Sequence, residues 1–198
     1  MRQGIFGGSF NPVHKGHLCM AREIMAAAPL DSIRFIPAAQ PPHKQGALLA
    51  EAHHRVAMLE LAISNEPDFL LDSRELLRGG TSYTVETLRE LHGDFPNDDF
   101  FFIIGADSLR DLPNWFCIEE IARMTAFLVA ARPGDAIEQA TLAAAEIPGL
   151  RFEVMPTTPQ DIASSTIRRS LQDDGAAPKG LHPAVLHYIL ERNLYLSA

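Results

Sequence analysis

A glycine-rich stretch at residues 4–17, GIFGGSFNPVHKGH, constrains the fold of this chain more than any other segment. Residues 3–6 form a short apolar run typical of a buried strand, and apolar residues at 18–28 recur at helical spacing. Gly7 and Gly8 lie between these two segments, and glycine adopts backbone conformations that a side chain forbids, so we expect a turn there. The pattern predicts a strand, a glycine-rich turn and a helix N-terminus.

This junction is a candidate anion-binding site. Backbone N–H groups and the positive end of a helix dipole converge where a turn enters a helix. His14 and His17 fall on one helical face, so a phosphate on the turn would meet two imidazoles as well as the amides. The glycine spacing matches neither the dinucleotide-binding fingerprint nor the P-loop. A tight turn in which His14 or His17 caps the helix explains the same spacing equally well.

The composition bounds the class of protein. The chain has 198 residues, 46% of them hydrophobic and 21% charged, which favours one globular domain. A net charge of -8 argues against nucleic-acid and anionic-membrane partners, so positive charge for a phosphate ligand must be local. Without a signal peptide or a membrane-spanning apolar run, we expect a cytoplasmic protein. The two cysteines lack metal-ligand spacing, and adjacent residues such as His53, His54 and Arg55 do not face one another on a helix, so no protein metal site is predicted.

Strand and helix patterns alternate along the chain. Apolar runs predict further strands at 32–37, 69–71, 99–104, 126–131 and 152–155. Helical patterns follow at 51–64, 85–91, 136–146, 161–169 and 182–195. This alternation predicts an α/β fold, a doubly wound, Rossmann-like parallel sheet with helices on both faces and a C-terminal helical segment from about residue 164. We expect one domain spanning residues 1–198. The oligomeric state is left open, a homo-oligomer included.

Several polar residues follow predicted strands, where open α/β sheets bind their ligands. Lys44, after the second strand, is placed to reach a phosphate, although a single loop lysine is more often simply solvated. Asp107, after Gly105, would hold a ribose hydroxyl or a hydrated magnesium ion, or else cap the next helix. Trp115 lies in a loop-like segment, where an indole either stacks on a planar ring or packs against the core.

A second phosphate-binding candidate lies late in the chain. The hydroxyl groups of Ser164, Ser165 and Thr166 precede Arg168 at the start of a predicted helix. Hydroxyl and N–H donors with an arginine one turn further on suit a phosphate. A capped helix with a surface arginine is the plain alternative.

Residues 8–17, GSFNPVHKGH, resemble the signature of the nucleotidyltransferase superfamily that carries the H-x-G-H motif. Later segments narrow this resemblance to the bacterial nicotinate-nucleotide adenylyltransferases, in the same order and over nearly the whole chain. These segments are PPHK at 41–44, SYTVETL at 82–88, GADSL at 105–109, LPNW at 112–115, RPG at 132–134 and SSTIR at 164–168. The late motif departs from the family pattern, with Ala163 at its first Ser position and Ser165 at its Thr position, which leaves open which hydroxyl contacts phosphate.

The resemblance implies adenylyl transfer from ATP to nicotinate mononucleotide, giving deamido-NAD and pyrophosphate in NAD biosynthesis, with Mg²⁺ carried mainly by the ATP phosphates. Such chemistry needs positioning and positive charge rather than a protein nucleophile. An imidazole beside a polyphosphate should favour its charged form, so activity is expected to fall as pH rises. The implied catalytic residues are His14, His17, Lys44 and Arg168. The implied ATP-binding residues are Gly7, Gly8, Ser9, Phe10, Gly105, Asp107, Arg132, Ser164, Ser165 and Thr166. The implied acceptor-binding residues are Tyr83, Thr84 and Trp115.

Two other functions are compatible with the motifs. A related transferase with the H-x-G-H motif would use nicotinamide mononucleotide or phosphopantetheine as acceptor, although segments 83–84 and 113–115 argue against phosphopantetheine. A nucleotide-binding sensor without turnover would need affinity alone. Retention of both histidines, Lys44 and Arg168 argues against the sensor.

Overall fold

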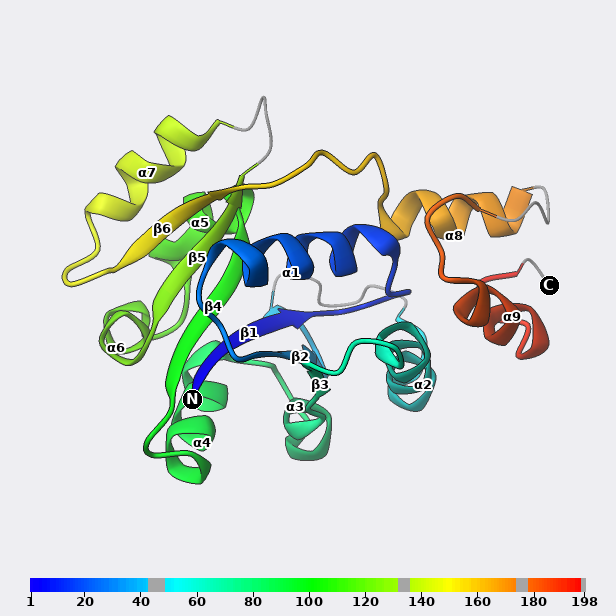
Figure 1. Cartoon of the computed structure of the whole chain (residues 1–198), viewed down its shortest axis with the longest axis horizontal. Coiled ribbons are helices and arrows are strands. Elements are labelled where there is room, and N and C mark those ends of the chain that lie inside the picture. The colour runs from blue at the N-terminus through cyan, green and yellow to red at the C-terminus, as the bar shows by residue number, and fades with distance from the viewer. Residues whose placement is uncertain (43–48, 132–135, 174–177, 197–198) are drawn as a thin grey trace.

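The computed structural model describes residues 1–42, 49–131, 136–173 and 178–196. Within these ranges the chain forms a six-stranded sheet with the order β3-β2-β1-β4-β5-β6 (Figure 1). Every neighbouring pair of strands is parallel, as the alternating pattern predicted. The strands are β1 (Arg2–Gly8), β2 (Ser32–Pro37), β3 (Phe69–Leu71), β4 (Asp99–Gly105), β5 (Ala126–Ala131) and β6 (Phe152–Pro156).

Helices cover both faces of this sheet and build two separate cores. One core contains apolar residues from α1, α2, α8 and α9, and the other contains residues from α4, α5, α6 and α7. No helix in the described part of the chain is long and apolar enough to cross a membrane. The helices are α1 (Lys15–Ala27), α2 (Ala52–Ile63), α3 (Arg74–Arg78), α4 (Thr84–Asp94), α5 (Ala106–Asp111), the 3₁₀ helix η2 (Leu112–Asn114), α6 (Ile118–Met124), α7 (Ile137–Ala145), α8 (Ser164–Asp173) and α9 (Pro183–Glu191).

The central strands are largely apolar because neighbouring residues point into opposite cores. In β1, Phe6 belongs to the core under α1 and Ile5 to the core under α4. In β4, Ile103 belongs to the core under α1 and Phe102 to the core under α4. A parallel sheet covered on both faces has no solvent-facing row of side chains, so its strands read as continuous apolar runs. The predicted doubly wound fold is confirmed.

Most element boundaries lie close to the sequence patterns. The strand β1 extends to Gly8, two residues beyond the predicted run, and the larger differences lie at helix ends. The short helices α3 and α6 were not predicted. The last helix ends at Glu191 rather than at residue 195, because Asn193 and Tyr195 have φ angles of 51° and 62° that no α-helix contains. The late helix begins at Ser164, three residues after the predicted start.

The site is positioned by the point where the strand order reverses. From β1 the chain first adds β2 and β3 on one side and then β4, β5 and β6 on the other. The carboxyl ends of the neighbouring strands β1 and β4 therefore open a crevice, which is where doubly wound sheets bind ligands. Figure 1 shows α8 and α9 at the same end of the molecule as the turn between β1 and α1.

Candidate active site

The turn between β1 and α1 is built differently from the prediction. Gly7 and Gly8 continue β1 without a positive φ, and the left-handed backbone lies at Phe10, with φ of 45°. A Cβ atom at Gly8 would lie 3.1 Å from Cζ of Phe10. Glycine is therefore required at this position for the close approach of an aromatic ring, and the turn itself is made by other residues.

Phe10 forms the floor of the turn. Its side chain is buried, and its ring centroid lies 5.7 Å from that of Phe6, 5.8 Å from that of Phe35 and 5.2 Å from that of His17. This packing joins the turn to the apolar core and leaves only the backbone of Phe10 for a ligand.

The two histidines are coupled to each other. His14 occupies the N-cap of α1, and its backbone N–H donates a hydrogen bond to Nδ1 of His17 over 3.2 Å. The two rings stack with their centroids 3.7 Å apart and their planes 28° from parallel. A neutral His17 therefore carries its proton on Nε2. The two histidines therefore lie together at the helix start, as the capping interpretation predicted, and the anion-binding interpretation stays a prediction.

His14 is held neutral by its surroundings. Its residue surface is 8% exposed, and this burial lowers the pKa of His14 to about 4. Its Nδ1 atom has no hydrogen-bond partner among the described residues, and a Cβ atom at Gly16 would lie 3.0 Å from it. Burial thus opposes the charged form that was expected for an imidazole beside a polyphosphate.

The late hydroxyl-rich helix is fastened to the turn. Ser164 Oγ donates to the carbonyl of Pro12 over 2.9 Å, and Arg168 Nη1 donates to the carbonyl of Asn11 over 2.7 Å. Ser165 and Arg168 also line a hollow of about 610 Å³ between α8 and the C-terminal segment, and Thr166 is exposed outside this lining. The structure therefore brings Ser164 and Arg168 directly to the turn.

A cleft of about 350 Å³ lies at the carboxyl ends of β1 and β4. It gathers residues from the turn, from the two strand ends, from the loop after β2 and from the segments before α4 and α6. Its lining includes Gly7, Gly8, Ser9, His17, Ala38, Pro42, Glu75, Ser82, Thr84, Gly105, Ser108 and Trp115. His14 and His17 also line a neighbouring hollow of about 140 Å³ together with Thr157 and Gln160.

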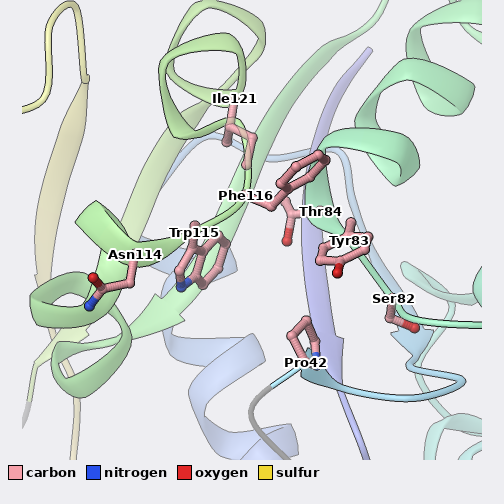
Figure 2. A pocket seen from close by; sticks show the side chains of 8 residues that line it. All are labelled: Pro42, Ser82, Tyr83, Thr84, Asn114, Trp115, Phe116 and Ile121. Atoms are coloured by element: carbon pink, nitrogen blue, oxygen red, sulfur yellow. The ribbon is translucent and has the colours of Figure 1, made fainter.

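A second pocket of about 350 Å³ continues the cleft, since both are lined by Pro42, Ser82, Thr84 and Trp115. Figure 2 shows the indole of Trp115 on one side of this pocket and the ring of Tyr83 on the other. Phe116, which the sequence analysis did not select, packs on Tyr83 with ring centroids 4.8 Å apart.

Trp115 packs against the core, as one of the two predictions for it stated, and its stacking on a ligand stays a prediction. One edge of the indole packs against the core, 6.0 Å from Phe102 and 6.2 Å from Phe127 between ring centroids and at angles of 84° and 74°. The indole also lines the pocket beside Tyr83. The core contacts hold the ring in place, so the pocket has a fixed aromatic wall.

Some of the predicted site residues are not brought to the cleft. Asp107 lies in the first turn of α5 with its side chain 85% exposed and paired to Arg110 over 3.2 Å. It does not cap that helix, because Gly105 occupies the N-cap. Lys44 and Arg132 lie outside the described residues.

The sequence analysis missed Arg55, which is 2% exposed in α2 and donates hydrogen bonds to carbonyls of the cleft walls. The available signal was its helical spacing to Met58 and Leu59, which places all three on one face. Asn11 was also missed. Its Oδ1 accepts hydrogen bonds from Tyr195 and from the backbone of Ala50.

A doubly wound parallel sheet with a phosphate-type turn at its switch point, two coupled histidines and an adjoining aromatic pocket defines a nucleotide-binding transferase of the H-x-G-H class. Residues 5–170 match the cytidylyltransferase-like family. The chain belongs to this family and, within it, to the nicotinate-nucleotide adenylyltransferases, as the relatives described next show.

A probable nicotinate-nucleotide adenylyltransferase of Synechococcus sp. (strain JA-3-3Ab) is 41% identical over 197 residues, covering 98% of this chain and 95% of that protein. The nicotinate-nucleotide adenylyltransferase of Bacillus subtilis (strain 168) is 40% identical over 195 residues, covering 98% of both. A solved structure of Plasmodium falciparum nicotinic acid mononucleotide adenylyltransferase complexed with NaAD has a TM-score of 0.81 at 24% identity, covering 98% of this chain and 97% of that one. This structure shows the shared fold.

Proposed function

We propose that this protein transfers the adenylyl group of ATP to nicotinate mononucleotide, producing deamido-NAD and pyrophosphate for NAD biosynthesis. The observation that carries this proposal is that the glycine-rich turn with His17 and the aromatic pocket of Trp115 adjoin in one cleft. Relatives about 40% identical over 98% of the chain carry the corresponding name, which supports it. We assign the reaction to a single domain spanning residues 1–198 and located in the cytoplasm.

The reaction needs no protein nucleophile. An oxygen of the mononucleotide 5′-phosphate forms a bond to the α-phosphorus of ATP. The bond from that phosphorus to the oxygen bridging to the β-phosphate breaks, and pyrophosphate leaves with the electron pair. Mg²⁺ enters with the ATP phosphates as part of the substrate and offsets their charge. The protein contributes alignment and hydrogen-bond donors aimed at the phosphates.

On the ATP side, we assign the phosphates to the turn. Backbone groups of Gly7, Gly8 and Ser9 and the Nε2–H of His17 would contact them, because these residues line the cleft. Neutral His14 would act by holding the ring of His17 in place. The residues proposed to neutralise or hold the rest of ATP are Lys44, Gly105, Arg132, Ser164, Ser165, Thr166 and Arg168. Asp107 is exposed and does not line the cleft, so the earlier prediction of an ATP contact for it is not carried into this proposal.

On the acceptor side, we assign the pyridine ring to the space between Trp115 and Tyr83. The helix α4 begins at Thr84 with Tyr83 at its N-cap, and Tyr83 makes no side-chain cap hydrogen bond. The first-turn N–H groups and the helix dipole favour negative charge at this end of the pocket. This favours the carboxylate of nicotinate over the uncharged amide of nicotinamide.

The test is magnesium-dependent pyrophosphate release from ATP with nicotinate mononucleotide, beside parallel reactions with nicotinamide mononucleotide and phosphopantetheine. We expect turnover with the acid and at most weak turnover with the other two. Preference for the amide would overturn the assignment of the pocket at Tyr83 and Thr84. ATP binding without turnover on any acceptor would instead support the nucleotide sensor.

A further inference from the structure

Arg55 is a buried cation that the proposed reaction has not used. Its residue surface is 2% exposed, and the three hydrogen bonds that it makes to described residues all go to backbone carbonyls. Nη1 donates to Ser9 over 2.9 Å and to Ala38 over 2.7 Å, and Nε donates to Ala50 over 3.1 Å. No ion pair joins Arg55 to a carboxylate among the residues described, and the hydroxyl of Tyr195 is the group that opposes the effect of burial on its pKa.

This environment is costly for an arginine. Burial of a charge is unfavourable unless it is paired, and here burial lowers the pKa of Arg55. Three carbonyl dipoles stabilise the guanidinium without cancelling its charge. Two of those carbonyls belong to Ser9 and Ala38, which line the nucleotide cleft. The uncompensated charge therefore lies directly behind the cleft wall.

Arg55 also lies beside a strained position of the turn. Phe10 has a left-handed backbone, and side chains rarely adopt it. Arg55 holds Ser9 on one side of Phe10, and Asn11 is held on the other side. Asn11 Oδ1 accepts from Tyr195 over 2.7 Å and from the N–H of Ala50 over 3.0 Å. Both sides of the strained residue are thus tied to the same short segment at Ala50.

We propose that Arg55 is a positioning residue that fixes the phosphate turn and supplies the positive field that the phosphates of ATP complete. The carbonyl of Ser9 and the N–H of Phe10 belong to one peptide group. A cation bonded to that carbonyl polarises the N–H and makes it a stronger donor. The ligand recognised is the polyphosphate of a nucleoside triphosphate, so the inference rests on the proposed function only in taking ATP as the donor.

The experiment compares the dissociation constants of ATP and adenosine, measured by calorimetry without any acceptor. Arg55→Met removes the charge and should weaken ATP binding about tenfold or more, while adenosine, which has no phosphate, should change less than about threefold. Arg55→Lys keeps the charge and should keep ATP binding within about threefold of wild type. Its turnover should fall at least tenfold, because an ammonium group does not reproduce the planar fork of an arginine.

Arg34→Met is the matched control. Arg34 is 14% exposed in β2, and it is already paired with Asp72 over 3.4 Å. Its loss should lower stability without changing the ratio of ATP to adenosine affinity. If Arg55→Met does not fold, Arg55→Gln, whose amide still donates to a carbonyl, replaces it as the neutral variant.

If the neutral variant binds ATP and adenosine more weakly by the same factor, Arg55 has a purely structural role and the proposal is overturned. Unchanged ATP affinity in that variant, or loss of ATP affinity in Arg55→Lys, would overturn it as well. A different result would contradict the proposed function, namely wild-type protein that binds ATP but does not turn over nicotinate mononucleotide.

Discussion

The rings of His14 and His17 stack 3.7 Å apart, and the backbone N–H of His14 donates to Nδ1 of His17. Two imidazoles at this distance repel each other when both are charged, and burial keeps His14 neutral. The pair is therefore asymmetric. His17 lines the cleft, where we propose that it contacts a phosphate, whereas His14 does not line the cleft and stacks on His17.

Removal of the His17 side chain should abolish most turnover and leave the fold intact. We expect His17→Ala to lower kcat by about 10²- to 10³-fold, the effect of losing one preorganised donor to the developing charge. His53→Ala is the control, because His53 lies on α2 with its side chain 64% exposed. Steady-state pyrophosphate release measures both. A loss below tenfold in His17→Ala would remove His17 from the reaction.

The buried neutral state of His14 should make the protein less stable in acid. The pKa of His14 is about 4 in the folded protein and about 6.5 when exposed, so the unfolded chain binds a proton first as pH falls. His14 therefore costs no stability above about pH 6.5, where it is neutral in both states. Between about pH 6.5 and pH 4 the free energy of unfolding should fall by about 3 kcal/mol. Urea unfolding at pH 7, 6, 5 and 4.5 tests this against His14→Asn. All other titrating groups are present in both proteins, so only His14 can make their pH dependence differ. Parallel plots of unfolding free energy against pH for wild type and His14→Asn would contradict the role given to His14.

Gly16 is required by the ring of His14 rather than by its own backbone angles. A Cβ atom there would lie 3.0 Å from Nδ1 and 3.1 Å from Cε1 of His14. Gly16→Ala should displace the ring, lower stability by about 1–3 kcal/mol and reduce turnover. Gly93→Ala is the matched control in α4, where nothing lies within 4 Å of the new Cβ atom. It should raise stability by about 0.5–1 kcal/mol. Thermal unfolding and turnover of the two variants decide between these expectations.

The sequence predicted the sheet well because its signals are local. Largely apolar runs identified β2, β3 and β5 at their observed bounds, since helices cover both faces of the sheet and favour apolar residues in its strands. The location of the phosphate turn followed from its glycines and histidines. The backbone conformation of this turn could not be predicted in the same way. Its left-handed residue is Phe10, and an aromatic residue does not indicate a left-handed conformation in a sequence.

The parts of the site that sequence reasoning missed depend on contacts between distant segments. Arg55 bonds carbonyls of Ser9 and Ala38, and backbone acceptors have no signature in side-chain chemistry. The pKa of His14 depends on how deeply the helix start is covered, which only the folded chain sets. Trp115 and Tyr83 were selected as separate motifs, whereas their arrangement around one pocket follows from the fold.

Trp115 should determine affinity for the acceptor rather than for ATP. Its indole lines the pocket opposite Tyr83, so Trp115→Ala should raise KM for nicotinate mononucleotide about tenfold, in line with the loss of aromatic stacking. KM for ATP should change less than about threefold, because the glycine-rich turn and His17 remain in place. Trp115→Phe keeps an aromatic surface and should lie between wild type and the alanine variant. Equal increases in the two KM values would contradict this assignment, since the indole would then support the whole cleft through its packing on Phe102 and Phe127.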